Sequence, residues 1–280
     1  MTYIATSPAE INPRLAEDGF VVVDLLPPEA VHALRAAHER LTPCARADFD
    51  STILSHDAGL RSAVDRLVRA AISPGVDNWL PSHRIAFCTF ALKRTTGDGG
   101  TVPMHQDWSF VDEARHRSFG LWCPLTSVDM GNGCLQMVKG SHAMPHPPRA
   151  ACSPFFYPGV EERLRATSLT TVPMRAGQAM LFDNRLFHCS PPNRSSIDRL
   201  AATGVLVPHA AKLRYYHQVD RQRPHLVEVF EVEDAFYLSH VAPGRPAHAT
   251  SLGIMDIRET VELSAPTRAA RSSRDSSHRA

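Results

Sequence analysis

Apolar side chains recur at helical spacing through the first part of the chain. A β-branched run over 18–24 predicts a short strand that stops before two prolines. From the second of these prolines the pattern predicts a helix over 28–41, with Pro28 in its first turn. The stretch DAGLRSAVDRLVRAAI repeats the helical spacing and predicts a second amphipathic helix over 57–72. Two helices therefore lead the chain.

From Ser82 onward the period of the pattern changes to that of strands. Short runs rich in β-branched and aromatic residues alternate with turn clusters such as GDGG, GNG and PPNRSS. The runs are HRIAFCTFALKR, RSFGLWCPL, GCLQMV, QAMLFDN and RLAATGVLVP. They predict a mainly β fold, a sandwich or jelly roll whose core covers about 82–210, with the two leading helices packed on its outer face.

Two segments depart from this pattern. Between 140 and 176 six prolines interrupt the chain, and this loop-rich excursion is expected to form a lid over one end of the β core. The last residues, 264–280, are rich in Ser and Arg and poor in apolar residues, so we expect a disordered tail there. The remaining residues, 1–263, are expected to form a single domain.

Composition narrows the choice of partners. A hydrophobic share of 43%, a charged share of 21% and a net charge of +1 give no reason to expect nucleic acid or an anionic membrane as a partner. No apolar run is long enough to span a bilayer, and the first residues lack the pattern of a signal peptide, so we expect a cytoplasmic protein. The six cysteines form no CxxC pair and are expected to be buried thiols. Nothing in the composition fixes the oligomeric state.

Candidate chemistry first occurs in the stretch MHQDWSF. Alternate side chains of an extended chain point to the same face, so His105 and Asp107 project together while Gln106 points away. An imidazole and a carboxylate on one face form part of a metal site. With 15 histidines in the chain, about one His-x-Asp tripeptide is expected by chance, so the motif alone favours a surface histidine beside a solvated aspartate.

A second histidine and an arginine, later in the chain, add to the evidence for a metal site. The cluster PPNRSS between two apolar runs predicts a β-hairpin, which places His188 opposite Arg199 with Cα atoms about 5 Å apart. Two imidazoles and one carboxylate form the facial triad of non-haem Fe(II), which leaves positions for a 2-oxo acid and O2. An arginine suits the far carboxylate of 2-oxoglutarate, because a guanidinium forms two parallel hydrogen bonds with a carboxylate. Without this spacing, the two residues are better explained as a core histidine and a surface arginine.

These residues belong to a longer resemblance. The stretches that carry it are EDGFVVVDLLPPEAVHALR, MHQDW, LWCPLTSVDMGNGCLQMVKGSH and FHCSPPNRSSIDR. In this order the chain resembles, over about residues 15–210, the phytanoyl-CoA dioxygenase family of Fe(II)/2-oxoglutarate oxygenases. The resemblance implies a double-stranded β-helix (a cupin-like jelly roll) in which His105, Asp107 and His188 are the catalytic iron ligands. It also implies that Arg199 anchors the 2-oxoglutarate cosubstrate. Lys139 departs from the family pattern, which has proline before this Gly-Ser-His.

Other positions near the site receive weaker assignments. Trp122 matches a family tryptophan near the cosubstrate, although a tryptophan in LWCPL is equally explained as core. Lys93, at the end of a predicted strand, is placed to reach the cosubstrate, although a lysine there is more often solvated. Trp108 and Phe110 directly follow the ligands and are candidates for the wall of the substrate pocket or for ordinary aromatic packing.

The favoured interpretation is an Fe(II)/2-oxoglutarate-dependent dioxygenase that hydroxylates a C–H bond of a small metabolite or natural-product intermediate and releases succinate and CO2. Desaturation and epoxidation stay open, whereas related halogenases carry a small residue in place of Asp107. The alternative is a non-oxygenase protein of the cupin type, an isomerase or a ligand-binding protein, which has no use for a guanidinium at Arg199. Nucleic-acid demethylation is disfavoured because the chain lacks a concentrated basic region outside the tail. No feature of the sequence identifies the substrate.

Overall fold

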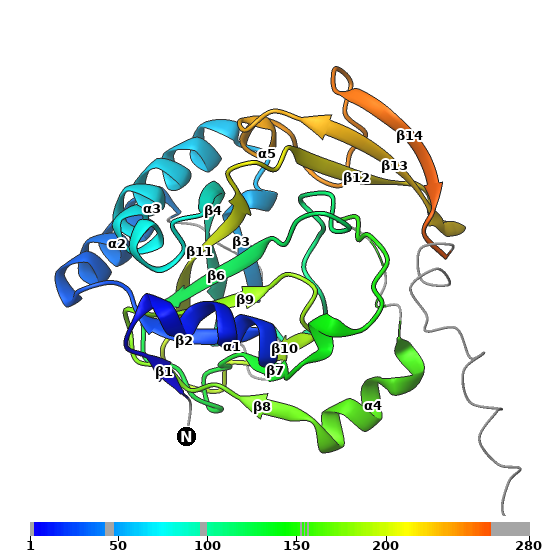
Figure 1. Ribbon diagram of the computed structural model, residues 1–280. Coiled ribbons are helices and arrows are strands. Elements are labelled where there is room, and N and C mark those ends of the chain that lie inside the picture. Colours follow the sequence, from blue (N-terminus) through cyan, green and yellow to red (C-terminus); the bar gives the residue numbers. More distant parts are fainter. Residues whose placement is uncertain are drawn as a thin grey trace, which may run out of the picture.

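Three β-sheets form the framework of the computed structural model, which describes residues 3–42, 48–95, 100–151, 153, 155 and 157–258 (Figure 1). The largest sheet contains, in order, β1 (Ile4–Ala5), β2 (Phe20–Asp24), β9 (Gln178–Asp183), β6 (Phe119–Pro124), β11 (Arg199–Pro208), β4 (His83–Lys93) and β3 (Phe49–Ser51). The second contains β5 (Val102–His105), β10 (His188–Ser190), β7 (Gln136–Val138) and β8 (Leu169–Thr171). The third contains β12 (Leu213–Asp220), β13 (Arg223–Val232) and β14 (Thr250–Asp256).

The seven-stranded sheet separates two hydrophobic cores. Along β2, Val21 and Val23 pack in the core shared with the leading helices, whereas Val22 packs in the core shared with the four-stranded sheet. The α-helices are α1 (Ile11–Glu17), α2 (Pro28–Leu41), α3 (Ala58–Trp79), α4 (Pro158–Thr167) and α5 (Phe236–Ser239). Figure 1 shows α2 and α3 beside β4 and β11. Because alternate residues of a strand face opposite ways, the helices cover one face of this sheet, as predicted, and leave the other face for the site.

The first predicted helix is confirmed and the second is longer than predicted. The helix expected over 28–41 is α2, with the same bounds. The helix expected over 57–72 is α3, which continues through Pro74 to Trp79. Val76 beyond the proline is only 3% exposed and lies in the core on the helix side of the sheet. Burial of the last turn therefore outweighs the one backbone hydrogen bond that the proline removes.

The fold is mixed α/β instead of mainly β, and it extends past the predicted core of about 82–210. Neither α1 nor α4 was predicted, and the third sheet lies wholly beyond that core. β12 and β13 pair as a hairpin through the sequence DRQR at 220–223, where Arg223 Nε donates to Asp220 Oδ2 at 2.9 Å. The four turn residues include no Gly or Pro, and the nearest proline, Pro224, lies inside β13, so the turn carries only a weak sequence signal.

The predicted hairpin between His188 and Arg199 is wrong. β10 pairs with β5 and β7 in the four-stranded sheet, whereas β11 pairs with β4 and β6 in the seven-stranded sheet. The connection between them crosses from one sheet to the other, and Asn193 fastens it by donating to the carbonyls of Lys93 at 3.2 Å and Ile197 at 2.8 Å. Two prolines open the connection and lack the N–H that a strand ladder requires, so the chain leaves its sheet there.

The excursion over 140–176 is more regular than predicted. It contains the 3-10 turn η3 (Ser141–Ala143), the helix α4 and the strand β8, which pairs with β7. Its role as a lid stays a prediction. Three of its residues (152, 154 and 156) and the tail over 264–280 lie outside the described residues. Of the six cysteines, the four in the described part are free and buried, as predicted: Cys88, Cys123, Cys134 and Cys189.

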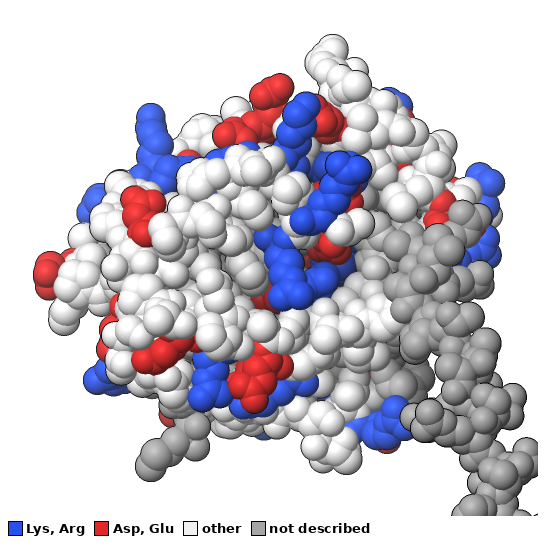
Figure 2. Space-filling model, viewed as in Figure 1, with Lys and Arg blue, Asp and Glu red and all other residues white. Residues whose placement is uncertain are grey.

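Charges of both signs are distributed over the surface. On the face shown in Figure 2, basic and acidic side chains lie interspersed. Several charged side chains of the described residues form ion pairs: Lys139 Nζ lies 3.0 Å from Asp18 Oδ2, and Arg84 Nη2 lies 3.1 Å from Asp234 Oδ1. Within the described ranges, no helix has both the length and the apolar character needed to cross a bilayer.

Candidate metal centre

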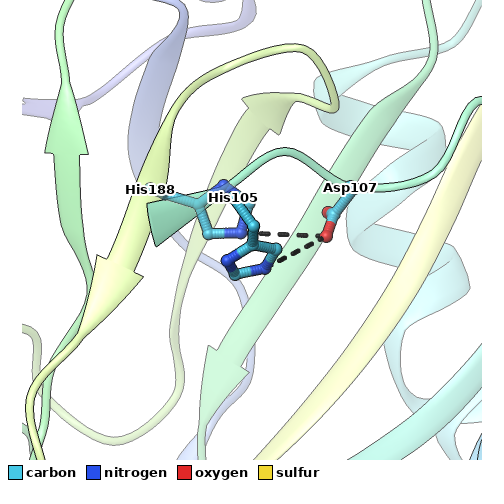
Figure 3. A group of neighbouring side chains, drawn as sticks. All are labelled: His105, Asp107 and His188. Carbon is cyan, nitrogen blue, oxygen red and sulfur yellow. Dashed lines mark ion pairs between the residues drawn. The ribbon is translucent and has the colours of Figure 1, made fainter. Parts of the chain in front are cut away.

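Two strands bring the predicted metal ligands together. β5 ends at His105, β10 begins at His188, and these two histidines are register partners in the antiparallel pair. Asp107 follows where the chain has left β5. One potential ligand atom from each of the three residues lies within 4.8 Å of the others. Figure 3 shows both imidazoles turned toward the carboxylate. The arrangement is that of a three-residue metal site on one end of the four-stranded sheet.

Backbone carbonyls fix which nitrogen of each imidazole faces the carboxylate. His105 Nδ1 donates to the carbonyl of Pro103 at 2.8 Å, and His188 Nδ1 donates to the carbonyl of Leu186 at 2.9 Å. The Nε2 atoms of the two rings lie 3.9 and 3.7 Å from Asp107 Oδ1. Burial, and then the neighbouring imidazole, lower the pKa of His105 to about 4, so this ring is neutral at pH 7. Two nitrogen lone pairs and one carboxylate oxygen fit a non-haem Fe(II) site with open positions.

Arg199 lies in the same cavity as the three ligands, although it belongs to the other sheet. Its side chain is buried, Nη1 donates to the carbonyl of Gly133 at 2.6 Å, and the guanidinium carbon lies 5.1 Å from the centre of the Trp122 ring. Within the described part of the chain no carboxylate pairs with it, and its buried Nε has no hydrogen-bond partner. Burial lowers the pKa of Arg199 to about 10, so it still carries its charge at pH 7. A buried cation without a counter-charge fits the site of an anionic ligand.

Lys93 is buried next to this arginine, so the solvated alternative does not hold. It is 0% exposed, and its Nζ donates to Ser190 Oγ at 2.6 Å and to the carbonyl of Pro191 at 2.5 Å. Burial, and then the charge of Arg199, lower the pKa of Lys93 to about 7. The charged form of this lysine is therefore costly until an anion binds nearby.

Behind the ligands lies a hydrogen-bonded support that we did not predict. Gln106 is buried beside the ligands, and its Nε2 donates to Nδ1 of His146 at 2.7 Å. Nε2 of the same imidazole donates to the carbonyl of Ser141 at 2.8 Å, and Ser141 Oγ accepts from the backbone N–H of Phe187 at 2.8 Å. These bonds connect the immediate chain neighbours of both ligand histidines. The one available signal was Gln106 itself, since an amide that faces the interior requires partners.

Arg149 supports the third ligand from the same side. Its side chain is 3% exposed, and its Nε donates to the backbone carbonyl of Asp107 at 2.7 Å. The guanidinium also forms two hydrogen bonds with the carboxylate of Glu113, at 2.9 and 2.5 Å. We call residues 141–149 the bracing segment, because its side chains hydrogen-bond to the chain neighbours of His105 and His188 and to the backbone of Asp107. This part of the predicted lid is therefore a support behind the metal site.

A cavity of about 280 Å³ opens beside the ligands. Its wall includes Trp122 at the end near Arg199, and the two aromatic residues predicted for the substrate pocket, Trp108 and Phe110. Phe110 is buried and packs against Phe87, with ring centres 5.6 Å apart. Of the predicted site residues only Lys93 lies outside this wall, where it contacts the wall residue Ser190.

Comparison with known sequences identifies the family. The sequence profile of the family described as phytanoyl-CoA dioxygenase matches residues 15–201, which is more than half of the chain. The matched range contains all three ligands and Arg199. The chain belongs to the phytanoyl-CoA dioxygenase family.

Individual members of the phytanoyl-CoA dioxygenase family are distant. The phytanoyl-CoA dioxygenase domain-containing protein 1 homolog of Dictyostelium discoideum is 26% identical over 112 residues. The aligned part covers 38% of this chain and only 40% of that relative. The third sheet lies beyond the range that the family profile matches. This later part of the chain nevertheless contacts the site, because Tyr237 of α5 packs against Phe110 of the cavity wall with ring centres 5.3 Å apart.

Solved structures share the fold. One is the epimerase SnoN in complex with Fe3+, alpha ketoglutarate and nogalamycin RO, with a TM-score of 0.56 and 22% identity, covering 74% of this chain and 85% of that one. Another is the non-heme alpha ketoglutarate dependent carbocyclase SnoK from nogalamycin biosynthesis, with a TM-score of 0.57 and 22% identity, covering 74% and 88% of the two chains. At this level of identity the likeness concerns the fold, the double-stranded β-helix of iron and 2-oxoglutarate oxygenases.

Proposed function

We propose that this family member is an Fe(II)- and 2-oxoglutarate-dependent dioxygenase that hydroxylates a C–H bond of a small metabolite or natural-product intermediate. The observation that supports this most directly is that the three-residue metal site shares one cavity with the buried Arg199, which has no carboxylate partner among the described residues. An iron ion held by these three residues would activate O2, so that substrate, 2-oxoglutarate and O2 would give hydroxylated substrate, succinate and CO2. The phytanoyl-CoA dioxygenase domain of the relative and the iron and alpha ketoglutarate named for SnoN support the same chemistry.

Different residues of the site bind the metal and 2-oxoglutarate. His105, Asp107 and His188 hold the iron on one side and leave its other positions for the cosubstrate and O2. Arg199 receives the far carboxylate of 2-oxoglutarate through paired N–H groups, and Trp122 supports the guanidinium with its ring. Lys93 adds a second positive charge behind the arginine once an anion is bound.

The proposal also specifies the type of reaction, hydroxylation. The neighbours SnoN and SnoK are named as an epimerase and a carbocyclase, so the shared fold is compatible with different outcomes. Hydroxylation makes the smallest demand on the protein, since it requires only one C–H bond held beside the metal. The product mass distinguishes the outcomes: hydroxylation adds one oxygen atom, ring closure removes two hydrogens, and epimerisation leaves the mass unchanged.

Succinate release tests the oxygenase function. The purified chain is incubated with Fe(II), ascorbate, 2-oxoglutarate and O2, and succinate is quantified; calorimetry with Ni(II) in place of iron measures metal and 2-oxoglutarate binding without turnover. We expect binding of both ligands and slow succinate release, each lost in His188→Ala. A protein that binds the metal but neither binds nor consumes 2-oxoglutarate would be of the cupin type, and the proposal would be wrong.

A further inference from the structure

The cavity wall away from Arg199 indicates the class of substrate, an inference that rests on the proposed oxygenase function. We infer that the substrate segment held beside the metal is uncharged and largely hydrocarbon, either a ring or a chain. The evidence is the charge of the wall, its hydrogen-bonding capacity and the exposure of its rim.

The described part of the wall has no charged side chain that is available to pair with a substrate. Apart from Asp107 and Arg199, none of the described residues that line the cavity is an Asp, Glu, Lys or Arg. In the proposed function Asp107 binds the metal and Arg199 binds 2-oxoglutarate, so neither is available to the substrate. A carboxylate, phosphate or ammonium group that enters would lose its water without gaining a counter-ion, which costs several kcal/mol. The wall therefore selects against a charged segment.

The wall also offers few hydrogen bonds. Among its polar side chains, Gln106 and Ser190 are already engaged, by His146 and Lys93 respectively. Apart from the two ligand histidines, the other neutral side chains of the described wall that can form hydrogen bonds are the hydroxyls of Ser51 and Thr203, the indole N–H groups of Trp108 and Trp122 and the thiol of Cys189. A polyhydroxylated or amide-rich segment would leave most of its groups unsatisfied. A hydrocarbon segment has no such requirement.

Aromatic side chains supply a preformed apolar surface. The rings of Phe87, Trp108 and Phe110 form a continuous group, with ring centres 5.6 Å apart for Phe87 and Phe110 and 6.2 Å apart for Trp108 and Phe110. Tyr237 packs behind them against both phenylalanines. Since this packing is complete without a ligand, the surface does not have to rearrange to bind one.

The rim of the cavity is apolar and exposed. Phe49 and Leu54 belong to the cavity lining but are 37% and 48% exposed. Large apolar side chains at the mouth of a pocket stabilise a ligand that covers them. With about 280 Å³ to be shared with 2-oxoglutarate, the cavity takes the reacting segment while the rest of a larger substrate lies over this rim.

Three probes with one ring system and different charges test the inference. They are 2-naphthol (neutral), 2-naphthoate (anionic) and 2-naphthylmethylammonium (cationic), titrated by calorimetry at pH 7 into the Ni(II)-loaded full chain saturated with 2-oxoglutarate. We expect 2-naphthol to bind at least about tenfold more tightly than either charged probe. Equal or tighter binding of a charged probe, or no binding of 2-naphthol, would overturn the inference.

A rim variant and its matched control locate the binding. Leu54→Lys places a cation at the cavity mouth and should raise the affinity of 2-naphthoate at least several-fold. Leu67→Lys changes an apolar residue of α3 that is 41% exposed and outside the cavity wall, and should leave all three affinities unchanged. The same response in both variants would overturn the inference. 2-Oxoglutarate is titrated into the Ni(II)-loaded protein before the probes are added, and its failure to bind would disprove the oxygenase function. Failure of the inference about the substrate is therefore distinguishable from failure of the oxygenase function.

Discussion

Lys93 and Arg199 are register partners on the paired strands β4 and β11, and both side chains are buried. Two cations therefore lie side by side in the interior, and the charge of the arginine contributes to lowering the pKa of Lys93 to about 7. Such a pair is unfavourable for folding by itself. It suits a protein whose interior receives an anion, so each member should make a distinct contribution to 2-oxoglutarate binding.

Arg199→Met should separate ligand binding from stability. Loss of charge-assisted hydrogen bonds, each contributing about 1.5–3 kcal/mol, should weaken 2-oxoglutarate binding roughly ten- to a hundredfold. Without ligands the variant should unfold at the same temperature as the wild type or higher, because a buried unpaired charge is removed. Calorimetry and thermal unfolding measure the two effects. Arg175→Met, at a side chain that is 73% exposed, is the control and should change neither.

Lys93→Met should alter the pH dependence of stability. The pKa of Lys93 is lowered to about 7 in the folded protein, against roughly 10.4 in an unfolded chain. Between these values the unfolded state binds more protons, so the wild type gains stability as the pH rises from about 7 to about 10. We expect the free energy of unfolding of the wild type, relative to the variant, to increase between pH 7 and pH 9.5 in urea titrations. Parallel pH profiles of the two proteins would contradict the lowered pKa of Lys93 in the folded protein.

His146→Leu should weaken metal binding through Gln106. Burial lowers the pKa of His146 to about 4, so the neutral ring accepts the amide hydrogen bond through Nδ1. Loss of a group that orients metal ligands commonly costs about ten- to a hundredfold in metal affinity. His146→Asn keeps an acceptor near Nδ1 and should recover much of the Ni(II) affinity measured by calorimetry. If both variants lose the same affinity, or neither loses any, His146 is not a positioning residue.

Arg149→Met should destabilise the fold and the metal site together. The variant leaves the carboxylate of Glu113, whose side chain is 11% exposed, without its partner. Breaking a buried ion pair in this way costs about 3–5 kcal/mol in the free energy of unfolding. The double variant Arg149→Met/Glu113→Gln should recover part of the loss in urea unfolding. Removal of an exposed pair by Arg175→Met should cost less than about 1 kcal/mol, and an equally small cost at Arg149 would contradict its assigned role.

Local periodicity in the sequence determined much of the fold. The spacing of apolar residues predicted α2 with its observed bounds and the strand runs that became β4, β6, β7, β9 and β11. Helical and strand periods arise within one segment, so they can be read from it alone. The same holds for His105 and Asp107, whose placement on one side follows from a chain that is extended near them. The family resemblance joined His188 and Arg199 to them.

Tertiary structure alone decided how these segments meet. His188 and Arg199 share a cavity because their strands lie in two different sheets, and the predicted hairpin between them does not form. The burial of Lys93 and the bracing by His146 likewise depend on residues distant in sequence. A strand carries unpaired backbone groups on both edges, so its own sequence does not specify its partner. Packing of the whole chain makes that choice.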